Sequence, residues 1–250
     1  MTPQVRKYVF ETLYKNRYLY RFASTVPFAG QWRVWQRLVL PRIVGHDVLE
    51  IGCGLGDLLV DMLSAGYNCY AVEQSPQMVV AARDTVKRLA LGTRATVIQG
   101  SAQHVPFSDG SFDTVVSTFP SEYIYDSDTI AEVERILRPG GRLIVVEGAN
   151  LLPVGFLQPF LVLIQMLVYG PSILMRNNRK NGDSSAANQA ERILYTDRNT
   201  ASGVTTQVLP DADFGQHIPL EKHGLRRRSE LVRSRRWEVY ITIGEKVETL

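Results

Sequence analysis

One stretch of the sequence, residues 48–59, constrains the fold more than any other. It opens with an apolar run around Glu50, continues with glycine at alternate positions 52, 54 and 56, and ends in an amphipathic run that starts at Leu58. A short apolar run of this kind is typical of a buried strand. Glycines after a strand let a ligand approach the bare backbone and the N-terminus of the next helix. The stretch therefore predicts a strand, a glycine turn and a helix that together hold a small ligand.

The class of ligand is narrowed by two acidic residues. Asp57 stands where the dinucleotide pattern Gly-x-Gly-x-x-Gly needs its last glycine, which argues against a nicotinamide dinucleotide. Glu73 follows the predicted strand 67–72, about twenty residues beyond the glycines, where a carboxylate can accept hydrogen bonds from both ribose hydroxyls. Dinucleotide enzymes share this second feature, so Glu73 predicts a nucleoside ligand without choosing between cofactors.

Strand and helix patterns alternate from residue 47 to residue 147, which predicts an α/β fold with a doubly wound, mostly parallel sheet. The further strands are expected at 95–99, 112–118 and 143–147, and helices at 58–66, 76–91 and 128–137. Helices are also expected over 4–40, with a break at Pro27 and Gly30, and a short last helix over 211–224. Alternating apolar residues predict two final strands at 225–231 and 237–243.

Four features agree in order and spacing with one known family. They are Glu50 before the glycines, Glu73, the segment Gly-Ser-Ala-Gln-His-Val-Pro-Phe-Ser-Asp-Gly-Ser-Phe-Asp at 100–113, and Leu-Arg-Pro-Gly-Gly at 137–141. The pattern resembles the class I S-adenosylmethionine-dependent methyltransferases, in particular the small-molecule, type 11 group related to ubiquinone and menaquinone biosynthesis. The resemblance implies a Rossmann-like seven-stranded sheet that ends in an antiparallel pair. N-terminal helices and an apolar insertion after strand five would complete the fold.

The resemblance also implies where S-adenosylmethionine would bind. The glycine loop would hold the methionine part, Glu73 the ribose, and the two segments at 74–75 and 101–102 the adenine. Ser101 stands where the family has an aspartate, and a hydroxyl is a weaker, uncharged acceptor for the adenine amino group. The full set of expected cofactor residues is Glu50, Gly52, Cys53, Gly54, Gly56, Glu73, Gln74, Ser75, Ser101, Ala102, Ser117 and Tyr20.

Methyl transfer from a sulfonium is an in-line displacement, so the protein mainly has to align the reactants and exclude water. A base is needed only where the acceptor must lose a proton. The loop 119–125 follows a central strand, at the edge where ligands of open α/β sheets bind. His104 is expected not to be catalytic, and the residue types and positions leave the base open among Glu122, Tyr123, Tyr125, His217 and His223.

The acceptor is predicted to be small and hydrophobic or amphipathic: a quinone, a lipid or a related metabolite. Residues 151–175 are nearly all apolar and contain three prolines, and a dense set of arginines lies at 226–236. Because strands on both sides of the apolar segment must join one sheet, a single membrane crossing is excluded. The segment is expected to be a lid over the acceptor, a homodimer contact, or a helix lying on an anionic membrane surface.

The whole chain is interpreted as a single methyltransferase domain. Its parts are a helical cap at 1–45, a cofactor-binding core at 46–150, an apolar flap and polar loop at 151–205, and a last helix with two strands at 206–250. Cys53 and Cys69 lack metal-ligand spacing, no signal peptide is recognised, and the net charge of +3 does not indicate a nucleic-acid partner. We expect a cytoplasmic enzyme without a metal, at most peripheral to a membrane. The alternatives are a non-catalytic cofactor-binding or scaffold protein and a nucleotide-dependent oxidoreductase.

Overall fold

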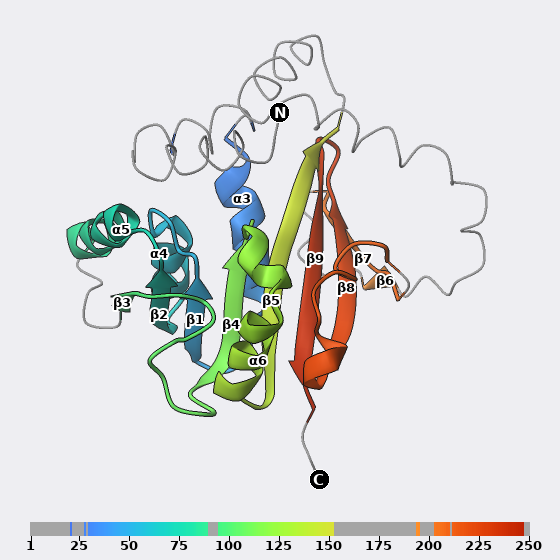
Figure 1. Ribbon diagram of the computed structural model, residues 1–250. Coiled ribbons are helices and arrows are strands. Elements are labelled where there is room, and N and C mark those ends of the chain that lie inside the picture. The colour runs from blue at the N-terminus through green and yellow to red at the C-terminus, as the bar shows by residue number, and fades with distance from the viewer. Residues whose placement is uncertain are drawn as a thin grey trace, which may run out of the picture.

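The structure is a computed structural model that describes residues 21, 28, 30–89, 95–152, 194–195, 203–210 and 212–247, and every structural statement concerns these residues (Figure 1). Three predictions lie wholly or largely outside them. They are the cofactor contact at Tyr20, the helix expected before Pro27, and the apolar flap, of which only Leu151 and Leu152 are described.

The described strands form one sheet in the order β3-β2-β1-β4-β5-β9-β8-β7-β6. Their bounds are β1 Asp47–Ile51, β2 Asn68–Glu73, β3 Ala95–Gln99, β4 Phe112–Thr118, β5 Leu137–Leu151, β6 Leu194–Tyr195, β7 Thr205–Val208, β8 Leu225–Arg233 and β9 Trp237–Lys246. Strands β1 to β5 pair in parallel, and every pairing from β5 onward to β6 is antiparallel. The doubly wound sheet is confirmed, whereas the expected number of seven strands is wrong because β7 and β6 extend the sheet beyond the predicted last pair.

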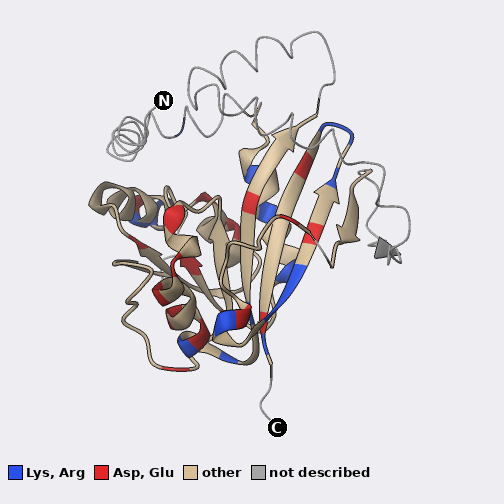
Figure 2. Cartoon of the chain, turned by 45° about the vertical axis from the view of Figure 1, so that its right-hand side comes forward, with Lys and Arg blue, Asp and Glu red and all other residues tan. Residues whose placement is uncertain are grey.

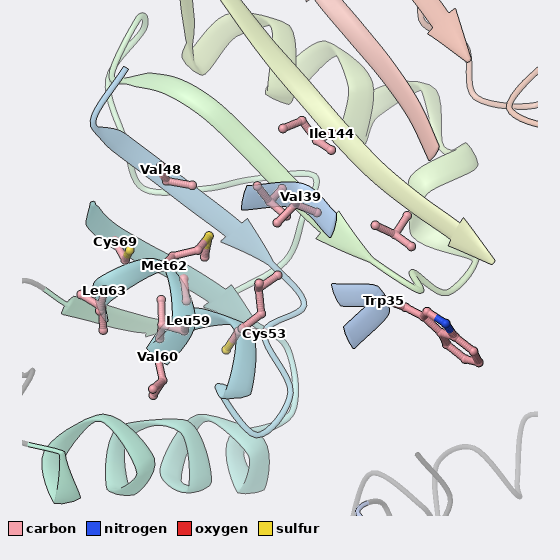
Figure 3. Close-up of a cluster of buried hydrophobic side chains, with 14 of the residues drawn as sticks. Trp35, Val39, Val48, Cys53, Leu59, Val60, Met62, Leu63, Cys69 and Ile144 are labelled. Atoms are coloured by element: carbon pink, nitrogen blue, oxygen red, sulfur yellow. The ribbon is translucent and has the colours of Figure 1, made fainter. Parts of the chain in front are cut away.

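Helices cover both faces of the parallel half. Their bounds are α3 Trp32–Gln36, η1 Arg37–Arg42, α4 Asp57–Ser64, α5 Pro76–Arg88, η3 Glu122–Tyr125, α6 Ser127–Ile136 and η4 Glu221–His223. One apolar core joins α3, α4 and α5 to the sheet, and Figure 3 shows Met62 and Leu59 of α4 against Cys69 and Cys53. A second core, on the opposite face, contains α6 and the segment before β8. In Figure 1, α6 accordingly lies in front of β4 and β5.

Local signals explain most element boundaries. Ser75 caps α5 by accepting a hydrogen bond from the Met78 amide at 3.4 Å, and Pro76 occupies the first turn. Strands β3 and β4 have the predicted bounds. Strand β5 begins six residues before the predicted 143, because the Pro-Gly-Gly turn loops out between its pairings through Leu137 and Arg142.

The prediction of a helix over 211–224 is wrong. The chain there makes a series of turns, and only Glu221–His223 is helical, as a 3-10 turn that ends at Gly224 in a left-handed conformation. Gly215 is also left-handed, with a φ of 78°, and its amide donates to the Glu147 carboxylate at 3.0 Å. A left-handed glycine and a proline four residues later, Pro219, both oppose a continuous helix.

Candidate functional site

The three loop glycines lie at the carboxyl end of β1, and all three have left-handed backbones. Their φ angles are 76° at Gly52, 53° at Gly54 and 79° at Gly56, values that residues with a Cβ rarely adopt. A Cβ on Gly52 would lie 2.7 Å from the Tyr123 hydroxyl, and one on Gly56 would lie 3.2 Å from Ala82 of α5. The loop therefore needs glycine both for its turns and for its close contacts, as the sequence pattern predicts.

Glu73 lies beside this loop at the end of β2. Its side chain is buried, and its two oxygens accept hydrogen bonds from the Gly54 amide at 3.0 Å and the Ser75 amide at 2.8 Å. These bonds hold the carboxylate between the glycine loop and the start of α5, with Gln74 exposed next to it. Each carboxylate oxygen can accept more than one hydrogen bond, so Glu73 keeps capacity for a ligand's hydroxyl groups.

Glu50 is the most unusual residue of the site. It is 0% exposed, and within the described part of the chain neither carboxyl oxygen has a hydrogen-bond partner. Burial raises the pKa of Glu50 well above its ordinary value, and the nearby charges of Glu73, Asp57 and Asp61 raise it further. An unpaired buried carboxylate is strongly disfavoured, so a cation that reaches this carboxyl would favour its ionised form.

Asp61, a second acidic residue close to Glu50, already has hydrogen-bond partners. Asp61 of α4 accepts two hydrogen bonds from the Arg33 guanidinium, at 2.9 and 2.8 Å. This pair ties α4 to α3. Burial raises the pKa of the neighbouring Cys53 thiol, so Cys53 acts as an apolar part of the loop.

Ser117 and Tyr123 occupy the carboxyl end of β4, next to β1. Their hydroxyl oxygens are 2.7 Å apart, and both approach the Ile51 carbonyl oxygen, at 3.3 Å from Ser117 and 3.1 Å from Tyr123. Tyr123 reaches this position from η3 and covers Gly52. Glu122 and Tyr125 of the same turn are exposed. Of the five base candidates, the structure brings Tyr123 against the glycine loop.

The two histidines among the candidates lie with other elements. The His223 Nε2 is 2.8 Å from the Ser127 hydroxyl at the start of α6, which the Lys222 ammonium also contacts at 3.0 Å. His217 is exposed in the turn before η4. His104 is exposed in the loop after β3.

The segment expected to hold adenine contains a polar chain that sequence reasoning missed. The Ser101 hydroxyl donates to the Gln103 side-chain oxygen, and the Gln103 amide group donates to Asp126 at 3.0 Å. The bond from Gln103, followed by one from the Asp128 amide, lowers the pKa of Asp126. Ala102 is buried beside them. The Ser101 hydroxyl, which stands where the resembled family has an aspartate, is thus hydrogen-bonded to Gln103. The Gln103 side chain therefore lies beside the position expected to contact adenine. The sequence offers no signal for a contact between residues 103 and 126.

Most of the arginines at 226–236 are neutralised by carboxylates. Ion pairs join Arg226 to Glu245, Arg227 to Glu221, Arg228 to Glu230 and Arg233 to Glu238. Arg235 and Arg236 are exposed in the hairpin between β8 and β9, and no ion pair to a described residue is present at either. Figure 2 shows basic and acidic positions interleaved along these strands and a basic hairpin at one end. The basic surface is therefore smaller than the sequence suggested.

A glycine loop after β1, an acidic residue ending β2 and a sheet that turns antiparallel after β5 together match a known family. The methyltransferase domain family matches residues 49–145. The match spans the parallel half of the sheet, from β1 to β5. The fold of this chain is also similar to that of a Methanococcus maripaludis protein described as an S-adenosyl-L-methionine-dependent methyltransferase. That similarity has a TM-score of 0.59 and 17% identity, and covers 95% of this chain and 94% of the other.

Relatives of the domain are named for several acceptors. The chain is 30% identical over 143 residues to a demethylmenaquinone methyltransferase of Corynebacterium glutamicum, covering 56% of this chain and 57% of the relative. It is 31% identical over 139 residues to a ubiquinone/menaquinone biosynthesis C-methyltransferase of Dinoroseobacter shibae, covering 53% and 55%. It is 28% identical over 100 residues to a sterol 4-C-methyltransferase of Caenorhabditis elegans, covering 40% and 30%. The chain thus spans between about a third and somewhat over half of the length of these relatives.

Proposed function

We propose that this chain transfers the methyl group of S-adenosylmethionine to a small hydrophobic or amphipathic acceptor. The observation that carries the proposal is the Glu50 carboxyl, which is fully buried beside a loop of three left-handed glycines and has no hydrogen-bond partner among the described residues. An unsatisfied acid at that position fits a ligand with a cationic group, and the amino-acid end of S-adenosylmethionine carries an ammonium. Bound there, S-adenosylmethionine supplies an electrophilic methyl group on a sulfonium.

The chain's own residues divide the work of binding. The bare backbone of the glycine loop accommodates the methionine part, and Glu50 pairs with its ammonium. The Gly54 and Ser75 amides hold the Glu73 carboxylate in place, and this carboxylate accepts hydrogen bonds from the ribose hydroxyls. Ser101, Ala102 and Gln103 border the adenine, with Gln103 as the polar group beside the ring. A dinucleotide would leave the Glu50 carboxyl without a cation, which disfavours an oxidoreductase.

The chemistry assigned to these residues is alignment. Tyr123 and Ser117 close the polar edge between β1 and β4, and their hydroxyls already bond to the Ile51 carbonyl. These two side chains form the surface against which the methyl donor binds, and neither transfers a proton. The acceptor approaches from the loop after β4, where its nucleophilic atom displaces the sulfonium in line. A proton that the acceptor loses passes to solvent or to a group outside the described residues.

The acceptor is proposed to arrive from an anionic membrane surface. The hairpin with Arg235 and Arg236 lies next to the point where the apolar segment leaves β5, because the Leu152 amide donates to the Arg236 carbonyl at 2.8 Å. Two exposed cations beside the first residues of an apolar segment suit an anionic lipid surface, with about 1 kcal/mol per engaged cation. No helix in the described ranges has the length and apolar character needed to cross a membrane.

The cofactor part is tested by thermal unfolding of the full chain with S-adenosylhomocysteine and, separately, with NAD. A ligand that binds only the folded state raises the melting temperature. We expect a rise with S-adenosylhomocysteine alone, and a rise only with NAD would refute the proposal. Mass spectrometry of quinone, lipid and metabolite extracts incubated with labelled S-adenosylmethionine then identifies the acceptor. Binding without any labelled product would favour a non-catalytic cofactor-binding protein.

The membrane part is tested by flotation with vesicles of anionic or neutral phospholipid at low salt. We expect recovery with anionic vesicles, and its loss in the double variant Arg235→Gln/Arg236→Gln. Arg226→Gln is the matched control, because Arg226 lies at the opposite end of β8 and is paired with Glu245. Equal recovery with both vesicle types, or an equal loss of recovery in Arg226→Gln and in the double variant, would show that the hairpin does not bind the membrane.

A further inference from the structure

Phe119 has a backbone conformation that calls for an explanation. Its φ is +50°, and it is the single non-glycine residue with a positive φ in the part of the chain that the structure describes. Phenylalanine has no side-chain group that would favour this conformation locally. Such strain persists only where the surroundings hold it, and it is concentrated at functional sites.

The strained turn directs the Phe119 ring toward α3. Successive residues of a strand face opposite sides of the sheet, so a regular continuation of β4 would put Phe119 on the same face as Ser117. Instead its ring stacks on Trp32 of α3, with centroids 4.1 Å apart and planes at 30°. Trp35 and Phe28 lie behind this pair, at 6.2 Å from Phe119 and 5.2 Å from Trp32. Phe119 and Trp32 are both only partly buried.

Two hydrogen bonds fix the pair to the strand ends. The Phe119 amide donates to the Val146 carbonyl of β5 at 2.7 Å, and the Gln36 side-chain amide donates to the Thr118 hydroxyl at 3.1 Å. Anchoring of α3 alone would not require a strained backbone, because an apolar side chain at position 118, which already faces α3 in the regular strand, could pack there. The conformation instead holds a flat ring at the carboxyl end of β4, two residues beyond Ser117 and its contact with Ile51 beside the glycine loop.

We propose that Phe119 and Trp32 are positioning residues that hold a flat-ring acceptor in line with the methyl donor. The inference rests on the proposed methyl transfer and narrows the acceptor to one with a planar ring, since stacked aromatic side chains bind a ring by further stacking. Tyr123 and Ser117 lie on the opposite face of β4 from this aromatic pair.

The test uses Phe119→Leu and Trp32→Leu, which keep an apolar side chain but remove the ring, beside the conservative variants Phe119→Tyr and Trp32→Phe. Phe214→Leu is the matched control, because its ring contacts Tyr240 at 5.1 Å in another part of the fold. Each variant is assayed for S-adenosylhomocysteine affinity, and for KM and kcat with a reduced, short-chain prenylated naphthoquinone. Quenching of tryptophan fluorescence by the oxidised naphthoquinone reports binding without turnover.

We expect the two leucine variants to raise the acceptor KM about two- to tenfold, the range that one aromatic stacking contact supplies. Their affinity for S-adenosylhomocysteine should stay within twofold of the wild type, and the conservative variants should recover most of the acceptor affinity. Trp32→Phe should lose most of the quenching, although two other tryptophans remain. Equal KM in all variants, or a loss of cofactor affinity that parallels the KM change, would overturn the inference. Failure of the wild type to bind S-adenosylhomocysteine would instead refute the proposed function.

Discussion

Replacing Glu50 with glutamine should stabilise the protein while weakening its ligand binding. The Glu50 carboxyl is buried and unpartnered in the described structure, and its pKa is raised above the ordinary 4.5 by burial first and by nearby acidic groups second. In the unfolded chain the residue ionises normally. As pH rises above about 4.5, unfolding is therefore increasingly favoured by the ionisation of Glu50 in the unfolded state alone.

The change in unfolding free energy with pH is set by the one proton that Glu50 binds in the folded but not in the unfolded state. Between the unfolded and the folded pKa of Glu50, this group lowers the wild-type free energy of unfolding by about 1.4 kcal/mol per pH unit. Glu50→Gln lacks this contribution, so its stability relative to the wild type should rise with that slope from pH 4.5 and become constant above the folded pKa. For a chain of this length each kcal/mol changes the melting temperature by roughly 2–4 °C.

Chemical unfolding of both proteins at half-unit intervals from pH 4 to pH 8 measures the slope. The exposed Asp84→Asn is the control for loss of one acidic group. A constant difference between Glu50→Gln and the wild type over the whole range would refute the burial of an unpaired acid at this position.

Calorimetry of ligand binding tests the predicted loss of affinity in Glu50→Gln. If the ammonium of S-adenosylhomocysteine pairs with ionised Glu50, the wild type must release a proton on binding, and its affinity should rise with pH below the folded pKa. The variant should bind at least tenfold more weakly, as expected for loss of a charged hydrogen bond, with no release of that proton. Equal proton release by the two proteins would separate Glu50 from the ligand.

Three further changes test other parts of the site and fold. Glu73→Gln should weaken S-adenosylhomocysteine binding by about 1.5–3 kcal/mol in calorimetry, because one charged acceptor is lost, and an unchanged affinity would remove Glu73 from the site. Gly52→Ala should destabilise by about 1–2 kcal/mol from its left-handed backbone alone, and Tyr123→Phe in the same chain should recover any additional loss due to the hydroxyl 2.7 Å away. Arg42→Met should cost roughly 2–3 kcal/mol in denaturant unfolding, less than the usual loss for a buried pair because Arg228 still contacts Glu230. The exposed Arg226→Met should cost less than 1 kcal/mol, and equal losses in the two variants would contradict this ranking.

The parallel half of the sheet was predictable because its signals are local. An apolar run followed by glycines and a serine-proline helix start at residues 75–76 each depend on neighbouring residues alone. The glycine loop and Glu73 come together as predicted, since both follow parallel strands that end at one edge.

What the sequence could not predict depends on distant contacts. The turn at Gly215 is set by Glu147, 68 residues earlier, which overrides a segment that otherwise reads as helical. The stack of Trp32 on Phe119 joins parts of the chain that lie 87 positions apart, and depends on a strained φ that no residue pattern signals. The short strand β7 pairs with β8 through only four residues, too few for a clear alternating pattern.

The pairing of β5 with β9 has a consequence for how the chain is synthesised. Arg142 pairs with Glu245, so one long edge of a central strand remains open until about a hundred more residues have been added. At ribosomal rates of roughly 5–20 residues per second, that interval lasts on the order of 5–20 s. During this time the apolar strand at 143–146 presents unpaired backbone groups to other chains, a known route to aggregation. Expression of this protein should therefore respond more strongly to slower synthesis at low temperature, and to chaperones that shield exposed strands, than its final stability would suggest.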